Sequence, residues 1–373
     1  MKNFLFPLLG IILFMFNCKS SDLSIKTIEV TSDIKNNVEL SDIAKVNNIV
    51  SLEYNGFDLF SEIASINRLD DKIIIHSLNP SMISIANENG QIINQLKPDD
   101  TDPFSINGIT EVKLYNNFIY VLDREHFQIN KMNIELERLS NVKLNYYIQS
   151  FEPLDNEVYF LYAGHEKTEN NSGMFLIYDS KEQKLLDDLI PIHLNTPNFF
   201  KFMTRNHIIR LSNNNFLLWD SSKNYIYNYS DSLEENYFID YGSRKLDDSF
   251  YETATFGNSY EFLTEMRKLN YAFRHFNIKS NDNYLNFSYE MEGGFINTLY
   301  NTQTGKTYNY KNVNDNLITG LSMPGLNYFN YLTEKDEFII YLSYEYLSKT
   351  ENEILKAAYD NNEDVLVFGT LKF

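Results

Sequence analysis

The chain has 373 residues, with 51 acidic residues against 32 basic ones, which gives a formal net charge of −19 at pH 7. This balance excludes a general nucleic-acid-binding protein, because such proteins need a concentrated basic surface. Acidity of this kind favours solubility and does not by itself mark a site. Aromatic residues make up 15% of the chain, a content that suits half-buried sheet surfaces.

The N-terminus has the features of an export signal. Lys2 precedes an apolar run from Phe4 to Phe16, which is 13 residues long. A membrane span needs roughly 20 such residues, so the run is typical of a signal-peptide core. Cys18 is the only cysteine of the chain. The residues that end on it, Met-Phe-Asn-Cys, resemble a bacterial lipobox, whose cysteine is lipidated; the alternative is an unrelated cysteine beside an ordinary signal.

We therefore expect a signal peptide over 1–17 and a lipid-anchored tether over 18–45, with a candidate strand at 25–30. The folded part should occupy 46–373. The expected location is the cell envelope, anchored to the outer membrane, with contact to the membrane through the N-terminal lipid only.

The stretch 68–96 predicts a small antiparallel sheet. Its apolar runs 73–77, 82–86 and 91–96 are bounded by Asn, Asp, Gly and Pro, which is the pattern of short strands. Asn89 and Gly90 supply the positive-φ positions that a tight hairpin needs. Since one small sheet cannot bury both of its faces, it requires neighbours of the same kind.

A polar turn followed by an apolar strand recurs along the whole chain, with strands that begin at 73, 118, 158, 216, 284 and 338. A four-stranded propeller blade takes roughly 40–50 residues, and longer intervals leave room for insertions. The repeat predicts an all-β fold, a six-bladed β-propeller with short helical insertions. A sandwich with similar hairpins is the alternative.

Two segments predict helices. Over 259–269, apolar residues fall at helical spacing. The second helix is expected after residues 348–351, whose Ser-Lys-Thr-Glu sequence matches a capping box. It should lie between the last two strands of the chain.

The two ends of the folded part should pair. Unpaired strand edges invite aggregation, and both the C-terminal run 365–373 and the entry strand 49–52 lack a partner in their own part of the sequence. We expect both strands in the same last blade, where their pairing closes the ring.

The entry strand Ile-Val-Ser-Leu-Glu at 49–53, the first hairpin closing on 88–91 and the ending 364–373 resemble the six-bladed β-propeller lipoproteins of Gram-negative bacteria. The resemblance extends from residue 48 to the C-terminus. The chain departs from that family at 98–108, where a Gly-Pro-Gly-Glu loop is usual, and at 362–364, where Asp-Asn-Pro is usual. The resemblance implies the fold and export, and it carries no assigned reaction or catalytic residues.

Signatures of catalysis are absent from the sequence. There is no Gly-x-Ser-x-Gly elbow, and the six histidines show no zinc-binding spacing, so we expect neither a metal nor a cofactor. A single Trp219-Asp220 pair lacks the Gly-His partner of a repeat signature, and we give it no weight. The sequence favours an exported binding protein without catalysis, whose partner is a small ligand, a glycan, a peptide or an envelope protein. The alternatives are a hydrolase or lyase that uses scattered carboxylate and His residues in the channel, and a scaffold subunit of an envelope assembly.

Candidate ligand-binding residues follow from propeller geometry, because the first strand of each blade lines the channel and loops gather at its mouths. Two arginines and two histidines fall on expected inner strands: Arg205, His207, Arg274 and His275. Three further candidates lie in loops after second strands: Arg124, His126 and His165. An arginine pair in the channel favours anionic or sugar-like ligands; the alternative is that each arginine pairs with an acidic residue of a neighbouring blade.

Overall fold

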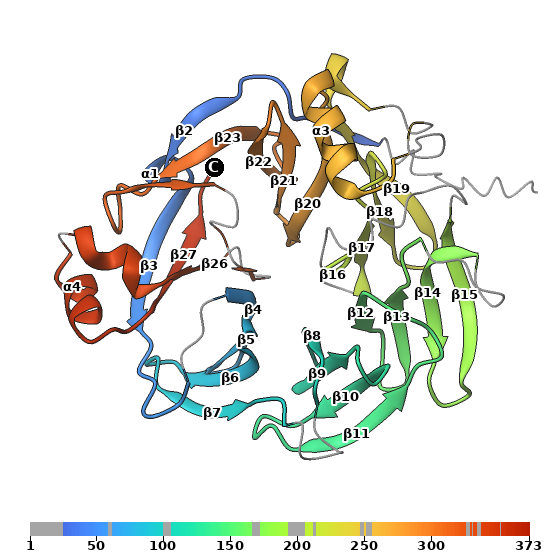
Figure 1. Ribbon diagram of the computed structural model, residues 1–373, viewed down its shortest axis with the longest axis horizontal. Coiled ribbons are helices and arrows are strands. Elements are labelled where there is room, and N and C mark those ends of the chain that lie inside the picture. Colours follow the sequence, from blue (N-terminus) through green and yellow to red (C-terminus); the bar gives the residue numbers. More distant parts are fainter. Residues whose placement is uncertain are drawn as a thin grey trace, which may run out of the picture.

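The computed structural model describes residues 25–58, 62–99, 106–165, 172–192, 206–211, 214–246, 250, 256–325, 329, 331–333, 337–350 and 352–373, without the side chains of Ser259, Arg274 and Lys349. Strands in these ranges form six sheets that stand around a common axis (Figure 1). The prediction of an all-β, six-bladed propeller with short helical insertions is confirmed. The signal segment 1–17 and Cys18 lie outside the described residues.

The sheets follow one another in chain order, each running from the channel outward. Blades 1 to 3 consist of β4 (Glu62–Leu69), β5 (Lys72–Asn79), β6 (Ser81–Asn87), β7 (Ile92–Leu96); β8 (Ile109–Tyr115), β9 (Phe118–Asp123), β10 (Gln128–Met132), β11 (Arg138–Lys143); and β12 (Ser150–Pro153), β13 (Val158–Tyr162), β14 (Gly173–Asp179), β15 (Lys184–Pro191).

The other three blades include strands from the N-terminal segment. Blades 4 to 6 consist of β16 (Ile208–Arg210), β17 (Phe216–Trp219), β18 (Tyr225–Tyr229), β19 (Leu233–Asp240), β1 (Lys26–Glu29); β20 (Phe273–Ser280), β21 (Tyr284–Met291), β22 (Gly294–Asn301), β23 (Thr307–Asn314), β2 (Lys35–Glu39), with β24 (Ser322–Pro324) beside β23; and β25 (Tyr331–Leu332), β26 (Glu337–Leu342), β27 (Val365–Leu371), β3 (Ala44–Ser51).

The six repeated strands of the sequence are the second strands of the blades: β5, β9, β13, β17, β21 and β26. The polar turns before them have a physical reason. Asp70, Asn117 and Asn214 in three of these turns have φ of 52°, 64° and 59°, a left-handed conformation that Asn and Asp tolerate better than most residues.

Alternation along the strands builds a hydrophobic core between each pair of neighbouring blades. On β5, Ile73 and Ile75 pack against blade 6, whereas Ile74 packs against blade 2. On β17, Leu217 and Trp219 face blade 5. Because successive side chains of a strand point to opposite faces, every blade is buried on both sides, which explains why its strands read as continuous apolar runs.

The ring closes in blade 6, where β27 and β3 pair antiparallel from Val365 opposite Ser51 to Leu371 opposite Ala44. This confirms the predicted pairing of the two ends. Just before β27, the Asp364 carboxylate accepts a hydrogen bond from the Tyr54 hydroxyl, and the Asp364 carbonyl accepts one from the Leu52 amide at 2.8 Å. These two bonds fix the end of β3 to the start of β27, and at the other end of the pair the Lys372 amide donates to the Ile43 carbonyl at 3.0 Å.

The N-terminal segment corrects the expected tether over 18–45. The strand predicted at 25–30 is present as β1, which pairs parallel with β19, and β2 pairs parallel with β23. Ile28 and Val30 are fully buried in the core between blades 4 and 5. Residues 26–39 therefore belong to the propeller, and Figure 1 shows this segment passing along its outside towards β3.

Helices fill connections between strands. The predicted helix over 259–269 is present as α3 (Ser259–Leu269), and α4 (Glu353–Asp360) lies between β26 and β27 as expected. The predicted capping box is wrong: Ser348 lies in η4 (Tyr344–Lys349), and the Asn352 side chain caps α4 by accepting from the amides of Ile354 and Leu355. The remaining short helices are α1 (Leu40–Ile43) and η3 (Gly242–Arg244). Among the described residues, no helix is long and apolar enough to cross a membrane.

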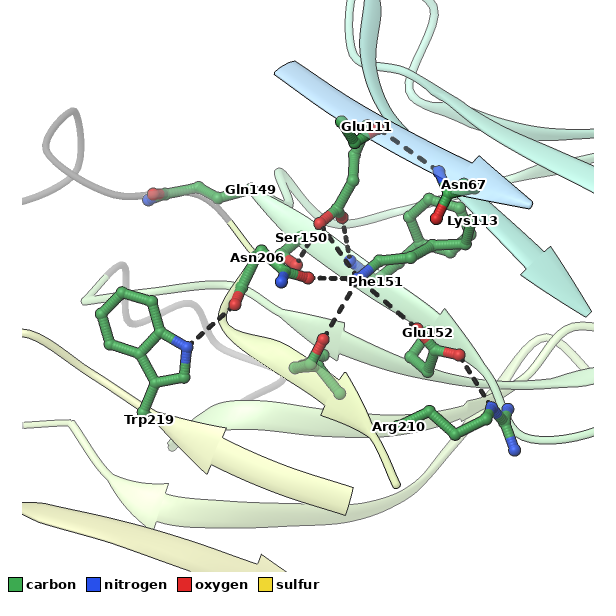
Figure 2. Close-up of polar contacts among 12 residues, drawn as sticks. Asn67, Glu111, Lys113, Gln149, Ser150, Phe151, Glu152, Asn206, Arg210 and Trp219 are labelled. Carbon is green, nitrogen blue, oxygen red and sulfur yellow. Dashed lines mark hydrogen bonds and ion pairs between the residues drawn. The ribbon is translucent and has the colours of Figure 1, made fainter. Parts of the chain in front are cut away.

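Buried charges join the inner strands of blades 2, 3 and 4 (Figure 2). The Lys113 ammonium on β8 lies 3.4 Å from a Glu111 oxygen and 3.5 Å from a Glu152 oxygen of β12. It also donates to the Asn206 side chain and, at 3.1 Å, to the Ile208 carbonyl. Arg210 of β16 donates to Glu152 at 2.9 Å. The network therefore crosses two blade interfaces.

Each carboxylate of this network interacts with more than one hydrogen-bond donor. Glu111 accepts from the Ser150 hydroxyl at 2.9 Å and from the Phe151 amide at 2.8 Å. Burial nevertheless raises the pKa of Glu111, although Lys113 and these donors act in the opposite direction. Removing a buried ionic partner is costly, because it leaves an uncompensated charge behind.

Closure predicts the effect of a C-terminal truncation. A chain that ends at Asp364 lacks β27, so β3 and β26 lose their common partner and the whole ring should open. We expect loss of the cooperative melting transition and rapid proteolysis throughout the chain. Near-native melting would show that β27 is not needed for closure.

A second test of the closure compares two glycine substitutions, one inside the β3–β27 pair and one outside it as a control. A Cβ on Gly369 in β27 would lie 2.6 Å from the Lys45 carbonyl oxygen of β3, whereas one on Gly294 would meet nothing closer than 3.9 Å. Gly369→Ala should therefore lower the melting temperature by several degrees, and Gly294→Ala should leave it nearly unchanged.

The charge network predicts the effect of Lys113→Met. Two buried carboxylates would lose their shared ammonium, and the free energy of unfolding in urea should fall by about 3 kcal/mol. Adding Glu111→Gln should recover part of the loss. The exposed Lys356 on α4 serves as control, with Lys356→Met expected within about 0.5 kcal/mol of wild type. Equal effects of the two substitutions would contradict a role for the network.

Candidate functional site

One end of the channel collects most of the predicted residues. In an antiparallel blade, the loop between the second and third strands lies at the same end as the start of the inner strand. This end, called here the loop end, holds Arg124 and His126 after β9, His165 after β13, and His275 near the start of β20. His207 directly precedes β16.

Asp220, which follows β17, is the centre of the loop end. Its carboxylate is buried and accepts hydrogen bonds from the Tyr162 hydroxyl, from His165 Nε2 at 3.2 Å, and from the Ser222 amide and hydroxyl. Burial acts to raise the pKa of Asp220, but His165, His207 and the Ser222 hydrogen bond outweigh it and hold that pKa well below its usual value. Asp220 is therefore a carboxylate that links blades 3 and 4.

A row of aromatic rings runs beside this carboxylate. The centroids of Tyr162 and His207 are 3.7 Å apart, those of His207 and Trp219 are 4.7 Å apart, and those of Trp219 and His275 are 5.6 Å apart. His207 Nδ1 donates to the Trp219 carbonyl at 3.0 Å, and Trp219 Nε1 donates to the Asn206 carbonyl at 2.8 Å. The row fixes side chains from blades 3, 4 and 5 relative to one another.

The hydrogen bond to Asp220 determines the tautomer of His165. Because the ionised carboxylate only accepts, the His165 Nε2 donates to it, which leaves Nδ1 as the other nitrogen of the ring. Nδ1 is buried and has no hydrogen-bond partner among the described residues. His165 is 8% exposed, so this nitrogen is held away from bulk water.

His275 also has a buried ring nitrogen without a hydrogen-bond partner among the described residues. Burial lowers the pKa of His275 to about 4, with Asp220 acting to raise it and His207 to lower it further, so the ring is neutral at pH 7. Nδ1 lies 3.4 Å from the Tyr241 hydroxyl. Nε2 is buried and makes no hydrogen bond within the described part of the chain.

Two hydrogen-bond donors, on Gln149 and Arg124, extend the group of buried atoms without partners into blade 2. Gln149 Nε2 and Arg124 Nε are buried and unpaired with respect to the residues that the structure describes. Arg124 Nη2 donates to the Gln149 carbonyl at 3.3 Å. Figure 2 shows the Gln149 side chain extending away from the charge network around Lys113.

Gly164 allows the His165 loop to approach Gln149. Its φ is +68°, and a Cβ at this position would lie 2.7 Å from Gln149 Nε2. The missing Cβ therefore lets the Gln149 amide pack against the Gly164 backbone, directly before His165.

The loop end thus presents buried donors and acceptors that no described residue uses. A buried polar group without a partner destabilises a fold by about 1–3 kcal/mol, and native structures contain few of them. Four of them form an arc across blades 2 to 5, from Arg124 through Gln149 and His165 to His275.

Only some of the residues predicted to bind a ligand lie together at the loop end. The structure brings His165, His207 and His275 together and places Arg124 beside them. His126 points outward: it is 40% exposed at its side chain and lies 2.7 Å from Asp123. Arg205 and the Arg274 side chain lie outside the described residues. Residues missed by sequence reasoning are Gln149, Tyr162 and Asp220, although the Trp219-Asp220 pair was a visible signal for the last.

Arg210 on the inner strand β16 pairs with Glu152 of the neighbouring blade. The choice between a ligand site and acidic partners for Arg205 and Arg274 stays a prediction, because Arg205 and the Arg274 side chain lie outside the described residues. Glu111 and Glu152 share the Lys113 ammonium, so they lie close together. Both are engaged in the network, which makes them poor candidates for a catalytic carboxyl pair. Among the described residues, no group of three or more His, Cys, Asp or Glu side chains could hold a metal ion.

Comparisons with solved structures agree with the fold. A protein described as exported, from Bacteroides fragilis NCTC 9343, is 16% identical with a TM-score of 0.75, over 94% of this chain and 100% of that one. A DUF4221 family member from Bacteroides vulgatus is 14% identical with a TM-score of 0.51, over 88% and 97% of the two chains. Virginiamycin B lyase from Staphylococcus aureus is 14% identical over 70% and 73% of the two chains, and its TM-score of 0.39 is too low to bear on chemistry.

No curated protein matches the chain. The model of the DUF5128 family, described as a 6-bladed beta-propeller, matches residues 17–341. The match covers most of the sequence, and it agrees with the six sheets and their order. The chain therefore belongs to the DUF5128 family of six-bladed β-propellers.

Proposed function

We propose that this protein is an exported, lipid-anchored propeller of the outer membrane that binds a hydroxyl-rich ligand, a glycan, at the loop end of its channel. The observation that carries the proposal is the arc of buried polar atoms without partners in the described structure. Peptides and envelope proteins are the other ligand classes that the sequence leaves open.

The chemistry of the arc favours hydroxyl groups. Gln149 Nε2 and Arg124 Nε are donors, whereas His165 Nδ1 is an acceptor, because Asp220 holds the proton on the other ring nitrogen. A hydroxyl group both donates and accepts, so neighbouring hydroxyls of one sugar satisfy both kinds of site. A purely anionic ligand would leave the His165 lone pair without a donor.

Anchoring places the propeller close to its membrane. The exported relative from Bacteroides fragilis supports export, and the sequence around Cys18 supports lipidation. Since β1 begins at Lys26, the eight residues back to Cys18 span at most roughly 28 Å. The outer edge of blade 4 would then lie near the lipid surface.

The pair of Asp220 and His165 favours a second candidate function. A carboxylate that holds one imidazole nitrogen and leaves the other unprotonated is an arrangement suited to a general base. In that case His165 removes a proton from a bound hydroxyl or carbon acid, and the protein is the hydrolase or lyase that the sequence left open.

The binding proposal is tested by titrating the purified protein with defined oligosaccharides in a calorimeter, after a glycan-array screen. Gln149→Leu removes an unpaired buried amide, so it should preserve or raise the melting temperature while weakening binding at least tenfold. His126→Ala, at the same end of the channel but exposed, should bind like wild type.

Three outcomes separate the possibilities. Absence of binding across the array, or unchanged affinity of Gln149→Leu, contradicts the proposal. Product formation that is lost in His165→Ala supports the enzyme instead.

The anchor has its own test. Cys18→Ser should leave the protein in the soluble periplasmic or secreted fraction with an unchanged melting temperature, because β1 and the propeller remain intact. Mass spectrometry should find an acyl group on wild-type Cys18. Membrane partitioning of Cys18→Ser, together with an unacylated wild type, would contradict lipidation.

A further inference from the structure

A groove lies on the outside of the propeller, where the N-terminal segment passes from blade 4 to blade 5. Its walls are β1, the connection from β1 to β2, the turn between β22 and β23, and the start of β23. Figure 1 shows β2 and β23 side by side along this outer edge. The groove has a volume of about 850 Å³, which falls in the range of small-molecule pockets, roughly 300–1,000 Å³.

The wall formed by the N-terminal segment is fixed to blade 5. Asn309 of β23 is buried, and its Nδ2 donates to the Glu29 carbonyl at 3.2 Å and to the Ser32 carbonyl at 3.0 Å. Its Oδ1 accepts from the Thr298 hydroxyl at 2.9 Å. Val30, within the same wall segment, is fully buried. The groove is therefore a built part of the fold.

The groove carries charges of both signs. Lys35 and Lys306 line it, and their ammonium groups lie 5.2 Å and 4.8 Å from the centre of the Tyr308 ring. Glu29 and Asp33 line the same groove, and all four charged side chains belong to exposed residues. A ligand with both a negative and a positive group matches this lining better than a simple anion does, because the two carboxylates repel an anion.

The chain leaves the propeller towards Cys18 beside this groove. Lys26, the first residue of β1, donates from Nζ to the Thr302 carbonyl at 3.2 Å. Thr302 lies in the turn between β22 and β23, which also carries the groove residue Lys306. The eight residues from Lys26 back to Cys18 span at most roughly 28 Å. A lipid on Cys18 therefore holds the groove close to the membrane surface.

We propose that this groove, called here the anchor groove, binds the headgroup of a zwitterionic membrane lipid, a phosphate diester that carries a primary amine. Lys35 and Lys306 are placed to contact the phosphate, and Glu29 and Asp33 to accept from the ammonium, in charge-assisted hydrogen bonds. Hydroxyl groups of the lining supply further donors to phosphate oxygens: Thr27, Ser32 and Thr307. The inference rests on the lipid anchor proposed for Cys18, because that anchor brings lipid to the groove.

Headgroup binding would orient the propeller on its membrane. The turn between the third and fourth strands of a blade lies at the opposite end from the loop between its second and third strands. The anchor groove, beside the turn from β22 to β23, is therefore at the other end of the ring from the loop end. A headgroup held there keeps the loop end facing away from the lipid and open to a glycan.

Calorimetric titration with O-phosphoethanolamine tests the groove. The protein is purified from the cell envelope in a polyoxyethylene detergent, which contains neither phosphate nor sugar. The double variant Lys35→Gln/Lys306→Gln should bind at least tenfold more weakly at an unchanged melting temperature. Lys311→Gln, at an exposed position on β23 outside the groove, should bind like wild type. Absence of binding, or wild-type affinity of the double variant, would overturn the proposal.

Inorganic phosphate separates the two halves of the ligand. Wild type should bind O-phosphoethanolamine at least tenfold more tightly than phosphate, because only the former has an amine for the carboxylates. The variant Glu29→Gln/Asp33→Asn should lose this preference without binding phosphate more weakly. Equal affinities of wild type for the two compounds would assign a site for free phosphate and contradict a zwitterionic headgroup.

Vesicle flotation tests the membrane source, using Cys18→Ser so that no acyl chain holds the protein. It should float more with vesicles of phosphatidylethanolamine and phosphatidylglycerol than with vesicles in which phosphatidylcholine replaces the phosphatidylethanolamine. The trimethylated amine of phosphatidylcholine has no N–H to donate to Glu29 or Asp33. Equal flotation with both vesicles would contradict the proposal.

Failure of the anchor and failure of the groove give different results. Mass spectrometry of wild type measures acylation of Cys18 independently of the titration. An unacylated Cys18 contradicts the anchor, whereas an acylated protein that does not bind O-phosphoethanolamine contradicts the groove alone.

Discussion

The pairing of β3 with β27 is the constraint on which the rest of the molecule depends. It joins segments more than 300 residues apart in sequence and turns an open row of blades into a ring. Each blade buries both of its faces against neighbours, so a missing contact at the closure exposes apolar surface on blades 6 and 1 together. The N-terminal segment strengthens this closure, because β1 and β2 cover the outer edges of blades 4 and 5 before β3 completes blade 6.

The polar interior of the ring divides into satisfied and unsatisfied groups. Around Lys113, every charge has an opposite charge and further hydrogen bonds, as expected for a network that holds blades together. At the loop end, Asp220 is fully satisfied but the histidine it orients is not. Unsatisfied buried groups weaken a fold, so the arc of atoms without partners in the described structure does not add to stability.

The sequence predicted the fold well because each blade repeats a local signal. The turns with Asp70, Asn117 and Asn214 adopt a left-handed backbone that few other residues favour, and the apolar strands after them are buried on both faces. The site was harder to predict. Asp220 matters because Tyr162 and His165 from another blade converge on it, and that convergence depends on blade packing. The parallel pairing of β1 with β19 and of β2 with β23 could not be predicted from the sequence either. Short strands such as 35–39, with one buried valine, have no strong periodicity.

The central claim is that the fold holds His165 by its Nε2 and leaves its Nδ1 without a hydrogen-bond partner among the described residues at the loop end. Nitrogen NMR of protein labelled in its histidine rings measures this directly, since protonated and unprotonated ring nitrogens differ widely in chemical shift. The account predicts one histidine at pH 7 with a protonated Nε2 and a bare Nδ1, assigned through its loss in His165→Gln, whose Nδ1 signal shifts when a bound glycan donates to it. A protonated Nδ1 on His165, or an Nδ1 signal that stays unchanged in the presence of a bound glycan, would contradict it.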